Sequence, residues 1–170
     1  MTHAADPEQL LEKLATDLEN LLEHRGIDNP LMVGIHTGGA WLAEKLHPRL
    51  NIQDDLATLD ISFYRDDFSR IGMNPQVKPS SLPPQVEDRH IILVDDVLQT
   101  GRTIRAAMNE IFDYGRPASI TLACLIERSG RELPIQADVV GQILELSNND
   151  QIKLTGPQPL AWEIKQIESR

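Results

Sequence analysis

The chain lacks several features that would mark it for export or for a membrane. A single cysteine, Cys124, excludes an internal disulfide, which fits the reducing cytoplasm. No apolar run approaches the length that crosses a bilayer, and no basic segment followed by an apolar stretch opens the chain. The five histidines show no metal-ligand spacing, so we expect no zinc site. We therefore expect a cytoplasmic protein that neither enters a membrane nor carries a secretory signal.

Positive charge is also scarce. The chain has 26 acidic residues against 16 basic ones, a net charge of −10. Nucleic-acid binding relies on Lys and Arg to neutralise phosphates, so the chain as a whole repels a polyanion, although a local basic patch is compatible with the count. The length of 170 residues, with 41% hydrophobic and 25% charged residues, indicates one ordinary globular domain over residues 1–170.

The most informative segment is residues 91–103, which read Ile-Ile-Leu-Val-Asp-Asp-Val-Leu-Gln-Thr-Gly-Arg-Thr. Residues 91–94 are apolar on both alternating faces, which favours a buried parallel strand. Asp95 and Asp96 follow, and we expect them at the end of that strand because an unpaired buried carboxylate is very costly. The carboxyl ends of strands are where open α/β sheets bind ligands.

A turn with the features of an anion site follows the two acids. Thr100, Gly101 and Thr103 come just before the helix-forming run 104–111. Free N–H groups at a helix start, joined by two hydroxyls, bind an anion, and glycine lets the backbone approach it closely. Acids that hold a polyol or Mg²⁺ beside an anion site fit a ribose 5-phosphate. The alternative is a solvated turn with a threonine cap, but the full string is more specific than that.

Strands and helices alternate along the rest of the chain. A helix is predicted from Asp6 to near Gly26, with a leucine stripe on one face. The further predicted elements are a strand at 31–35, a helix at 40–46 ended by Pro48, and strands at 56–64, 119–126, 139–141, 151–154 and 161–165. This order predicts a parallel sheet with helices on both faces.

Two connections carry further signals. The turn His36-Thr37-Gly38-Gly39 has two glycines that allow N–H groups to converge on an anion, although an ordinary strand-to-helix turn is the alternative. The stretch 65–88 holds four prolines and no clear periodicity. A loop of that length within a compact domain is usually functional.

The string at 91–103 resembles the 5-phosphoribosyl 1-diphosphate (PRPP) binding motif of type I phosphoribosyltransferases, and the resemblance extends from about Gly26 to Gly141. Four other strings look like the PyrR family in particular, the bifunctional pyrimidine operon regulators and uracil phosphoribosyltransferases. They are Leu-Asp-Ile-Ser-Phe-Tyr-Arg-Asp-Asp at 59–67, Gly-Arg-Thr-Ile-Arg-Ala-Ala-Met at 101–108, Gly-Arg-Pro-Ala at 115–118 and Arg-Glu-Leu-Pro-Ile at 131–135. The resemblance implies a parallel central sheet flanked by helices, a flexible loop at about 65–88 that closes over PRPP, and a small hood at about 127–170.

The resemblance implies an activity. The chain would convert uracil and PRPP to UMP and diphosphate with Mg²⁺, and would take part in regulating pyrimidine biosynthesis genes as a homodimer or higher homo-oligomer. Two alternatives remain open. One is a UMP- or UTP-sensing regulator with weak or no catalysis, which acts through RNA or a protein partner. The other is a transferase for another base, such as hypoxanthine or orotate.

The resemblance also implies roles for individual residues. Asp95 and Asp96 would be the catalytic acids at the ribose hydroxyls and, with Glu127, the ligands of Mg²⁺. The 5-phosphate would be bound by Gln99, Thr100, Gly101, Arg102 and Thr103. The diphosphate would be bound by Thr37, Gly38, Arg65 and Arg131. No strong general base is visible, so catalysis would rest on positioning and charge stabilisation.

The chain departs from the family pattern in three places. The diphosphate loop of the family usually reads Lys-Thr-Arg-Gly, whereas this chain has His36-Thr37-Gly38-Gly39. Gln136 and Gln142 stand where the family usually has basic residues, and the first helix is acidic where RNA-binding members are basic. These departures argue against RNA attenuation.

Overall fold

The central feature of the fold is a five-stranded parallel sheet. The computed structural model describes residues 3–61 and 86–167. The sheet has the strand order β2-β1-β3-β4-β5, and every neighbouring pair is parallel. Its strands are β1 (Leu31–Ile35), β2 (Ala57–Leu59), β3 (His90–Leu98), β4 (Ser119–Arg128) and β5 (Val139–Leu144). The predicted parallel sheet is confirmed, and β1 has the predicted bounds because its apolar residues are buried on both faces.

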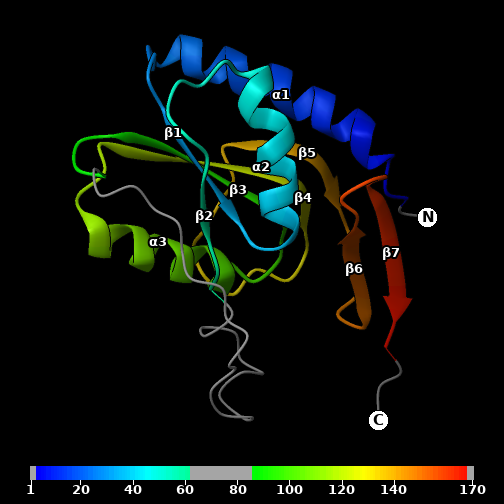
Figure 1. The fold of residues 1–170 in the computed structure, drawn as a ribbon. Helices are drawn as coiled ribbons and strands as arrows, with labels where there is room; N and C mark the ends of the chain where they lie inside the picture. Colours follow the sequence, from blue (N-terminus) through cyan, green and yellow to red (C-terminus); the bar gives the residue numbers. More distant parts are fainter. Residues whose placement is uncertain (1–2, 62–85, 168–170) are drawn as a thin grey trace.

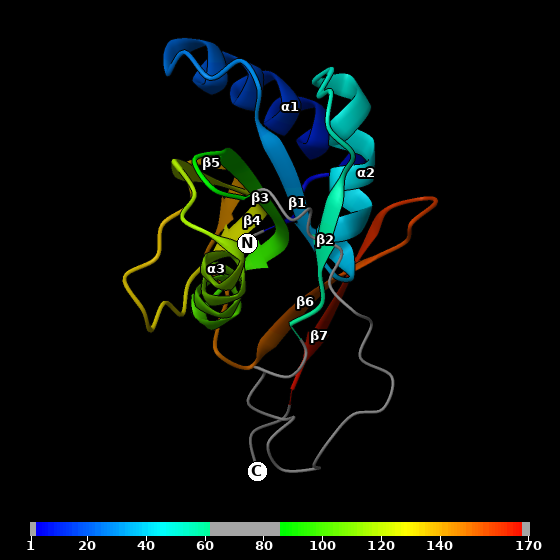
Figure 2. The same ribbon diagram turned by 60° about the vertical axis from the view of Figure 1, so that its left-hand side comes forward.

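Helices cover both faces of this sheet, as predicted. α1 (Pro7–His24) and α2 (Gly38–Arg49) lie on one face, and α3 (Arg102–Tyr114) lies on the other (Figures 1 and 2). The leucine stripe of α1 is the side that packs inward, with Leu14 and Leu18 fully buried. Two apolar cores result, one beneath α1 and α2 and one beneath α3.

A small antiparallel sheet stands beside the carboxyl end of the central one. It consists of β6 (Asp150–Thr155) and β7 (Ala161–Gln166), joined as a hairpin (Figure 1). Arg128, only 3% exposed, secures the segment leading into it, donating hydrogen bonds to the carbonyls of Ser147 (2.9 Å) and Asp150 (2.6 Å). Trp162 of β7 donates from Nε1 to the Ala5 carbonyl at 2.9 Å. The hairpin is thus tied both to β4 and to the N-terminal segment.

Several element boundaries differ from the predicted ones; β3 to β7, for example, are each longer than predicted. α2 runs through Pro48 to Arg49, because a proline in the last turn removes only one N–H and Leu50 still donates to the Leu46 carbonyl at 3.0 Å. α3 begins at Arg102 rather than at residue 104. The strand predicted at 56–64 is formed only at 57–59, and its part beyond residue 61 lies outside the described residues. Within the described residues, no helix is long and apolar enough to span a membrane.

Candidate active site

The two acids of the 91–103 string lie within β3 rather than after it. The strand continues to Leu98, and Asp95 is only 5% exposed, so the expectation that burial ends at this residue is wrong. Pairing of β3 with β1 stops at Val94, whereas pairing with β4 continues to Leu98. In this stretch Asp95 Oδ1 accepts from the Asp96 N–H at 2.9 Å, and Asp96 Oδ1 accepts from the Val97 N–H at 2.8 Å. Local hydrogen bonds make the buried acid tolerable.

The turn after β1 packs directly against these acids. A Cβ on Gly38 would stand 2.3 Å from Asp96 Oδ2, and one on Gly39 would stand 2.4 Å from the Val94 carbonyl oxygen. A side chain at Gly39 would meet the backbone of β3, whereas one at Gly38 would displace the carboxylate of Asp96. The structure therefore brings Gly38, a predicted diphosphate residue at the start of α2, to Asp96, a predicted catalytic acid.

The predicted 5-phosphate loop lies on the other side of the acids, at the start of α3. Gly101 caps the helix with a φ of 93°, a conformation that glycine adopts without strain. Thr100 Oγ1 accepts from the Arg102 N–H at 3.1 Å, so this hydroxyl occupies one N–H of the first turn. The first turn of a helix leaves further N–H groups without intrahelical acceptors, which is what the predicted phosphate site requires.

A pocket of about 200 Å³ joins Asp95 to this loop. It is lined by Asp95, Val97, Leu98, Gln99, Thr100, Gly101, Thr103, Ile104 and Ile152. The structure thus brings one predicted catalytic acid together with four predicted phosphate-binding residues. The fifth, Arg102, points away from the pocket and pairs with Glu132 at 3.0 Å on an exposed surface.

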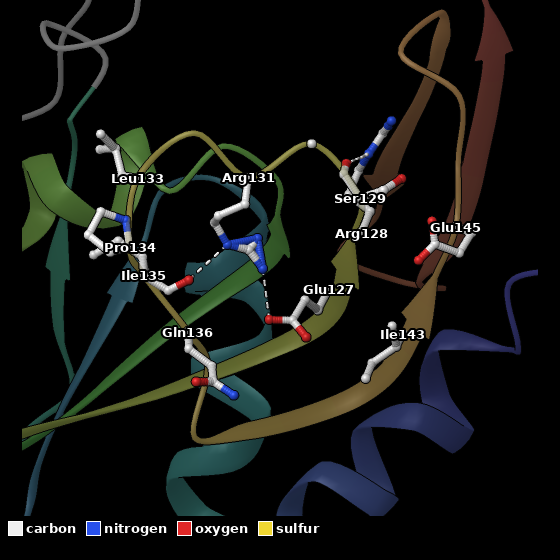
Figure 3. A pocket seen from close by; sticks show the side chains of 11 residues that line it. Glu127, Arg128, Ser129, Arg131, Leu133, Pro134, Ile135, Gln136, Ile143 and Glu145 are labelled. Atoms are coloured by element: carbon white, nitrogen blue, oxygen red, sulfur yellow. Dashed lines mark hydrogen bonds and ion pairs between the residues drawn. The ribbon is translucent and has the colours of Figure 1, made fainter.

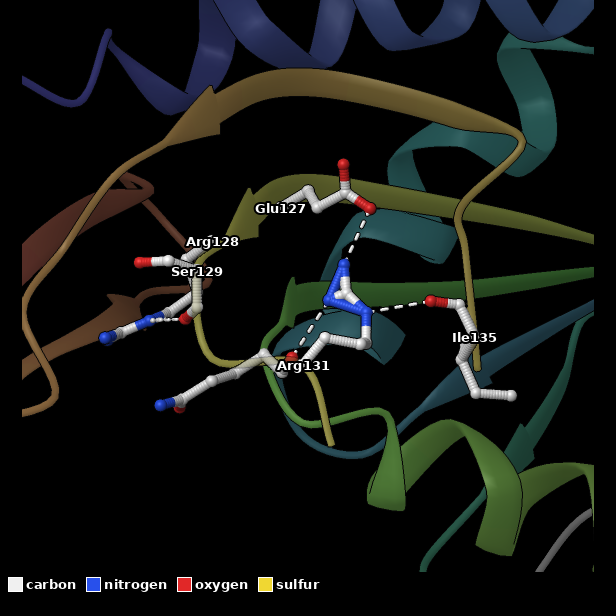
Figure 4. Close-up of polar contacts among 6 residues, drawn as sticks. Glu127, Arg128, Ser129, Arg131 and Ile135 are labelled. Atoms are coloured by element: carbon white, nitrogen blue, oxygen red, sulfur yellow. Dashed lines mark hydrogen bonds and ion pairs between the residues drawn. The ribbon is translucent and has the colours of Figure 1, made fainter. Parts of the chain in front are cut away.

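Arg131 and Glu127, predicted to bind diphosphate and Mg²⁺, are bonded to each other. Arg131 donates from Nη2 to Glu127 Oε1 at 2.8 Å and from Nε to the Ile135 carbonyl at 2.8 Å, as Figure 4 shows. Its Nη1 donates to the Gln99 carbonyl at 2.9 Å. Arg131 and Glu127 therefore pair with each other beside the predicted phosphate loop. Their roles in binding diphosphate and Mg²⁺ stay predictions.

A second, larger hollow of about 550 Å³ lies on the far side of Arg131 (Figure 3). It opens between residues 129–136 and β5. Its lining is Glu127, Arg128, Ser129, Gly130, Arg131, Leu133, Pro134, Ile135, Gln136, Ile143 and Glu145. Neither Asp95 nor Asp96 lines it. We place the candidate active site at the smaller pocket because Asp95 meets the start of α3 there, with Asp96 next to it in β3.

Cys124 lies fully buried beside the site, paired in register with Asp95. Burial raises the pKa of its thiol well above the ordinary value, and the charges of Asp95, Asp96 and Glu127 raise that pKa further. A thiol held in its neutral form is a poor nucleophile. Cys124 packs in the core beneath α3.

Some contacts at the site were not predicted, and one predicted site residue lies outside the described residues. Ile152 of β6 reaches the pocket by a fold-back of the hairpin that local sequence does not signal. The N–H groups of Glu132 and Leu133, which donate to the predicted phosphate loop, belong to a string in which only Arg131 was given a role. Arg65 and the predicted loop up to residue 85 lie outside the described residues.

Comparison with known proteins agrees with this geometry. The model of the phosphoribosyl transferase domain family matches residues 6–159. Among solved structures, a hypoxanthine phosphoribosyltransferase from Staphylococcus aureus superposes with a TM-score of 0.63 at 20% identity, over 82% of this chain and 75% of the other. A hypoxanthine-guanine phosphoribosyltransferase from Bacillus anthracis gives a TM-score of 0.64 at 16% identity, over 84% and 82%. The class is therefore that of the phosphoribosyltransferases, and the predicted fold class is confirmed.

Curated relatives narrow the class to one family. The bifunctional protein PyrR of Nitrosococcus oceani is 62% identical over 161 residues, which cover 94% of this chain and 91% of the relative. That of Pseudomonas aeruginosa is 57% identical over 164 residues, 96% of each chain. The chain belongs to the PyrR family, whose members combine a uracil phosphoribosyltransferase with a regulator of the pyrimidine operon. The predictions of family and enzyme class are confirmed.

Proposed function

We propose that this chain transfers the phosphoribosyl group of PRPP to uracil, giving UMP and diphosphate. One observation carries the proposal. The acid Asp96 lies against the start of α2 at Gly38, while its neighbour Asp95 lines the pocket at the start of α3. Two helix starts that favour anions thus flank a pair of carboxylates. PRPP has the same order of groups: a diphosphate, a ribose with two hydroxyls, and a 5-phosphate.

Each part of the site then has a separate task. The loop 99–103 holds the 5-phosphate, and Thr37 and Gly38 hold the diphosphate. Asp95 and Asp96 accept hydrogen bonds from the ribose hydroxyls. As the bond from C1 to diphosphate breaks, diphosphate leaves with the electron pair and positive charge develops on the ribose, which the adjacent carboxylates stabilise. Uracil N1 forms the new bond to C1 and gives up its proton to solvent.

The donor set suits Mg²⁺ as a cofactor that arrives with the substrate. Among the described residues, no cluster of three or more His, Cys, Asp and Glu side chains would form a protein-only metal site. Mg²⁺ usually takes one or two carboxylates and fills its remaining positions with water and phosphate oxygens. Asp95 and Asp96 would hold it, with Glu127 as a third candidate. The ion would neutralise charge on the departing diphosphate.

The direct test of the activity is release of diphosphate from PRPP. Purified protein with Mg²⁺ is given uracil, hypoxanthine or orotate in separate reactions, and diphosphate and the nucleotide product are measured. The proposal expects release with uracil, formation of UMP, and no release without a base. Release with hypoxanthine or orotate but not with uracil would assign the chain to another base.

We further propose that the chain binds UMP or UTP in the same pocket as a regulatory signal. It would pass this signal on through a protein partner or a second copy of the chain. The net charge of −10 disfavours RNA. The basic residues of α2 are also occupied: Lys45 pairs with Glu8 at 3.1 Å, and Arg49 pairs with Glu19. Titration with pyrimidine-gene leader RNA at several salt concentrations tests this, and tight binding with a steep salt dependence would favour RNA instead.

A further inference from the structure

We propose that Arg131 is a positioning residue for the 5-phosphate loop. It holds the Gln99 carbonyl of the loop, beside the Thr100 carbonyl that the backbone of residues 132–133 holds, so that the amide N–H groups of the loop face the phosphate. The inference rests on the proposed function, because it concerns how the same pocket binds the 5-phosphate. It gives Arg131 a task different from direct contact with diphosphate.

Hydrogen bonds from the segment 131–133 engage two consecutive loop carbonyls. Arg131 Nη1 donates to the Gln99 carbonyl at 2.9 Å. The N–H groups of Glu132 and Leu133 each donate to the Thr100 carbonyl at 3.0 Å. All of these donors approach the loop from one side, away from the pocket, since neither Arg131, Glu132 nor Leu133 lines it.

Because the peptide bond is planar, fixing the two loop carbonyls also fixes the direction of the N–H groups that follow them. In a planar trans peptide the C=O and the following N–H point in opposite directions. When the Gln99 and Thr100 carbonyls are held by the segment 131–133, the N–H groups of Thr100 and Gly101 point the other way. That way leads to the pocket, whose lining includes Gln99, Thr100 and Gly101. N–H groups fixed in advance toward an anion bind it without a cost of reorganisation.

Arg131 is itself held in a way that no other side chain reproduces. Its three donating nitrogens reach three acceptors: the nearby Ile135 carbonyl and Glu127 Oε1 (Figure 4), and the Gln99 carbonyl of the distant loop. The planar fork of a guanidinium makes such directional bonds together, whereas the single ammonium of lysine does not. The segment also packs on the loop, because a Cβ on Gly101 would stand 3.1 Å from the Ile135 side chain.

The test separates the 5-phosphate from the diphosphate. Calorimetric binding of ribose 5-phosphate, UMP and inorganic diphosphate is measured with the wild-type chain, Arg131→Lys and Arg131→Gln. A positioning role predicts that both variants bind ribose 5-phosphate and UMP about tenfold more weakly or worse, and diphosphate within about twofold of wild type. The reverse pattern, with diphosphate binding lost and UMP binding retained, would overturn the proposal. So would unchanged binding of all three ligands.

Two controls make the result specific. Arg25→Lys alters another inter-element arginine, which pairs with Asp138 at 3.1 Å and lies away from the pocket, and it should leave all three affinities unchanged. Should Arg131→Gln fail to fold, Arg131→Lys retains the charge and decides the question: a direct charge contact with diphosphate predicts that lysine preserves UMP binding, and positioning predicts that it does not. Kinetically, positioning predicts a raised KM for PRPP and an unchanged KM for uracil.

Failure of this inference is distinguishable from failure of the proposed function. If the wild-type chain transfers no phosphoribosyl group to uracil but binds ribose 5-phosphate in an Arg131-dependent way, the inference stands and the assigned base is wrong. If uracil transfer proceeds and the Arg131 variants bind ribose 5-phosphate as wild type does, the enzyme assignment stands and the inference is wrong.

Discussion

Asp96 and Gly38 are in such close contact that a single added carbon would separate them. A Cβ on Gly38 would stand 2.3 Å from the Oδ2 atom of Asp96. The contact joins the acid of β3 to the first residue of α2. It is the reason that the ribose and diphosphate sites of the proposed reaction adjoin, and it leads to the first prediction.

Gly38→Ala should lose activity while keeping most of its stability. The clash falls on the end of the Asp96 side chain, which can turn away at small cost but then leaves its place beside the ribose. Gly39→Ala is the matched control, because its Cβ would stand 2.4 Å from the Val94 carbonyl oxygen, a backbone atom. It should lose about 1–3 kcal/mol of unfolding free energy. Urea denaturation measures the stability of both variants, and uracil-dependent diphosphate release measures their activity. Equal losses of stability in Gly38→Ala and Gly39→Ala would contradict the prediction.

Asp96→Asn should slow turnover about a hundredfold or more, because it removes the charge that faces the developing cation. The fold should persist, since asparagine retains an oxygen that accepts from the Val97 N–H, now 2.8 Å from Asp96 Oδ1. Steady-state kinetics with saturating uracil and PRPP measure the effect. Asp113→Asn, the same change on the exposed end of α3, is the control and should leave turnover unchanged. Full activity of Asp96→Asn would defeat the assignment of the acids.

Cys124 should resist thiol reagents until the protein unfolds. Burial, followed by the charge of Asp95, raises the pKa of its thiol well above 9.0. Titration with a disulfide reagent at pH 8 should find no reactive thiol in the native chain, and one in urea. Rapid reaction of the native chain would show that the site opens around Cys124.

The raised pKa of Cys124 also predicts how the stability of the protein changes at high pH. The unfolded chain loses the thiol proton at a lower pH than the folded chain does, so the contribution of Cys124 to stability is complete below 9.0 and declines as pH rises toward the folded pKa. Between pH 8 and pH 10.5, chosen as about one unit or more on either side of that value, the wild-type chain should lose more unfolding free energy than Cys124→Ala. Parallel declines in the two proteins would contradict this.

Arg128→Met should weaken the attachment of the β6–β7 hairpin. The arginine is 3% exposed, and burial lowers its pKa. Its guanidinium donates hydrogen bonds to the carbonyls of Ser129, Ser147 and Asp150. Removing their donor should cost about 1–3 kcal/mol. Amide hydrogen exchange in the hairpin should rise with it. Arg116→Met, on an exposed position, should change stability by less than about 0.5 kcal/mol; a similar loss there would show that the effect is not specific to the anchor.

The parts of the fold that follow from local pattern were predictable. The apolar run of β1 and the leucine stripe of α1 each indicate a buried face. The order of residues in the string at 91–103 is specific enough to predict an anion site beside two acids. These signals depend on neighbours in the sequence. The predicted helix α1 and strand β1 are confirmed, and the anion site stays a prediction.

The remaining features depend on contacts between distant segments. Asp95 was expected at the end of its strand, but β4 continues to pair with β3 beyond it and keeps it buried. Arg131 donates to the carbonyl of Gln99, 32 residues away, a contact that no spacing in the sequence reveals. Ile152 enters the pocket only because a hairpin folds back over it.

The most direct test of the account is the structure of the chain with UMP bound. We predict that the phosphate lies against the N–H groups of residues 99–103 and that the ribose hydroxyls face Asp95 and Asp96. A nucleotide bound elsewhere, for example in the hollow between residues 129–136 and β5, with the pocket at the start of α3 empty, would contradict it.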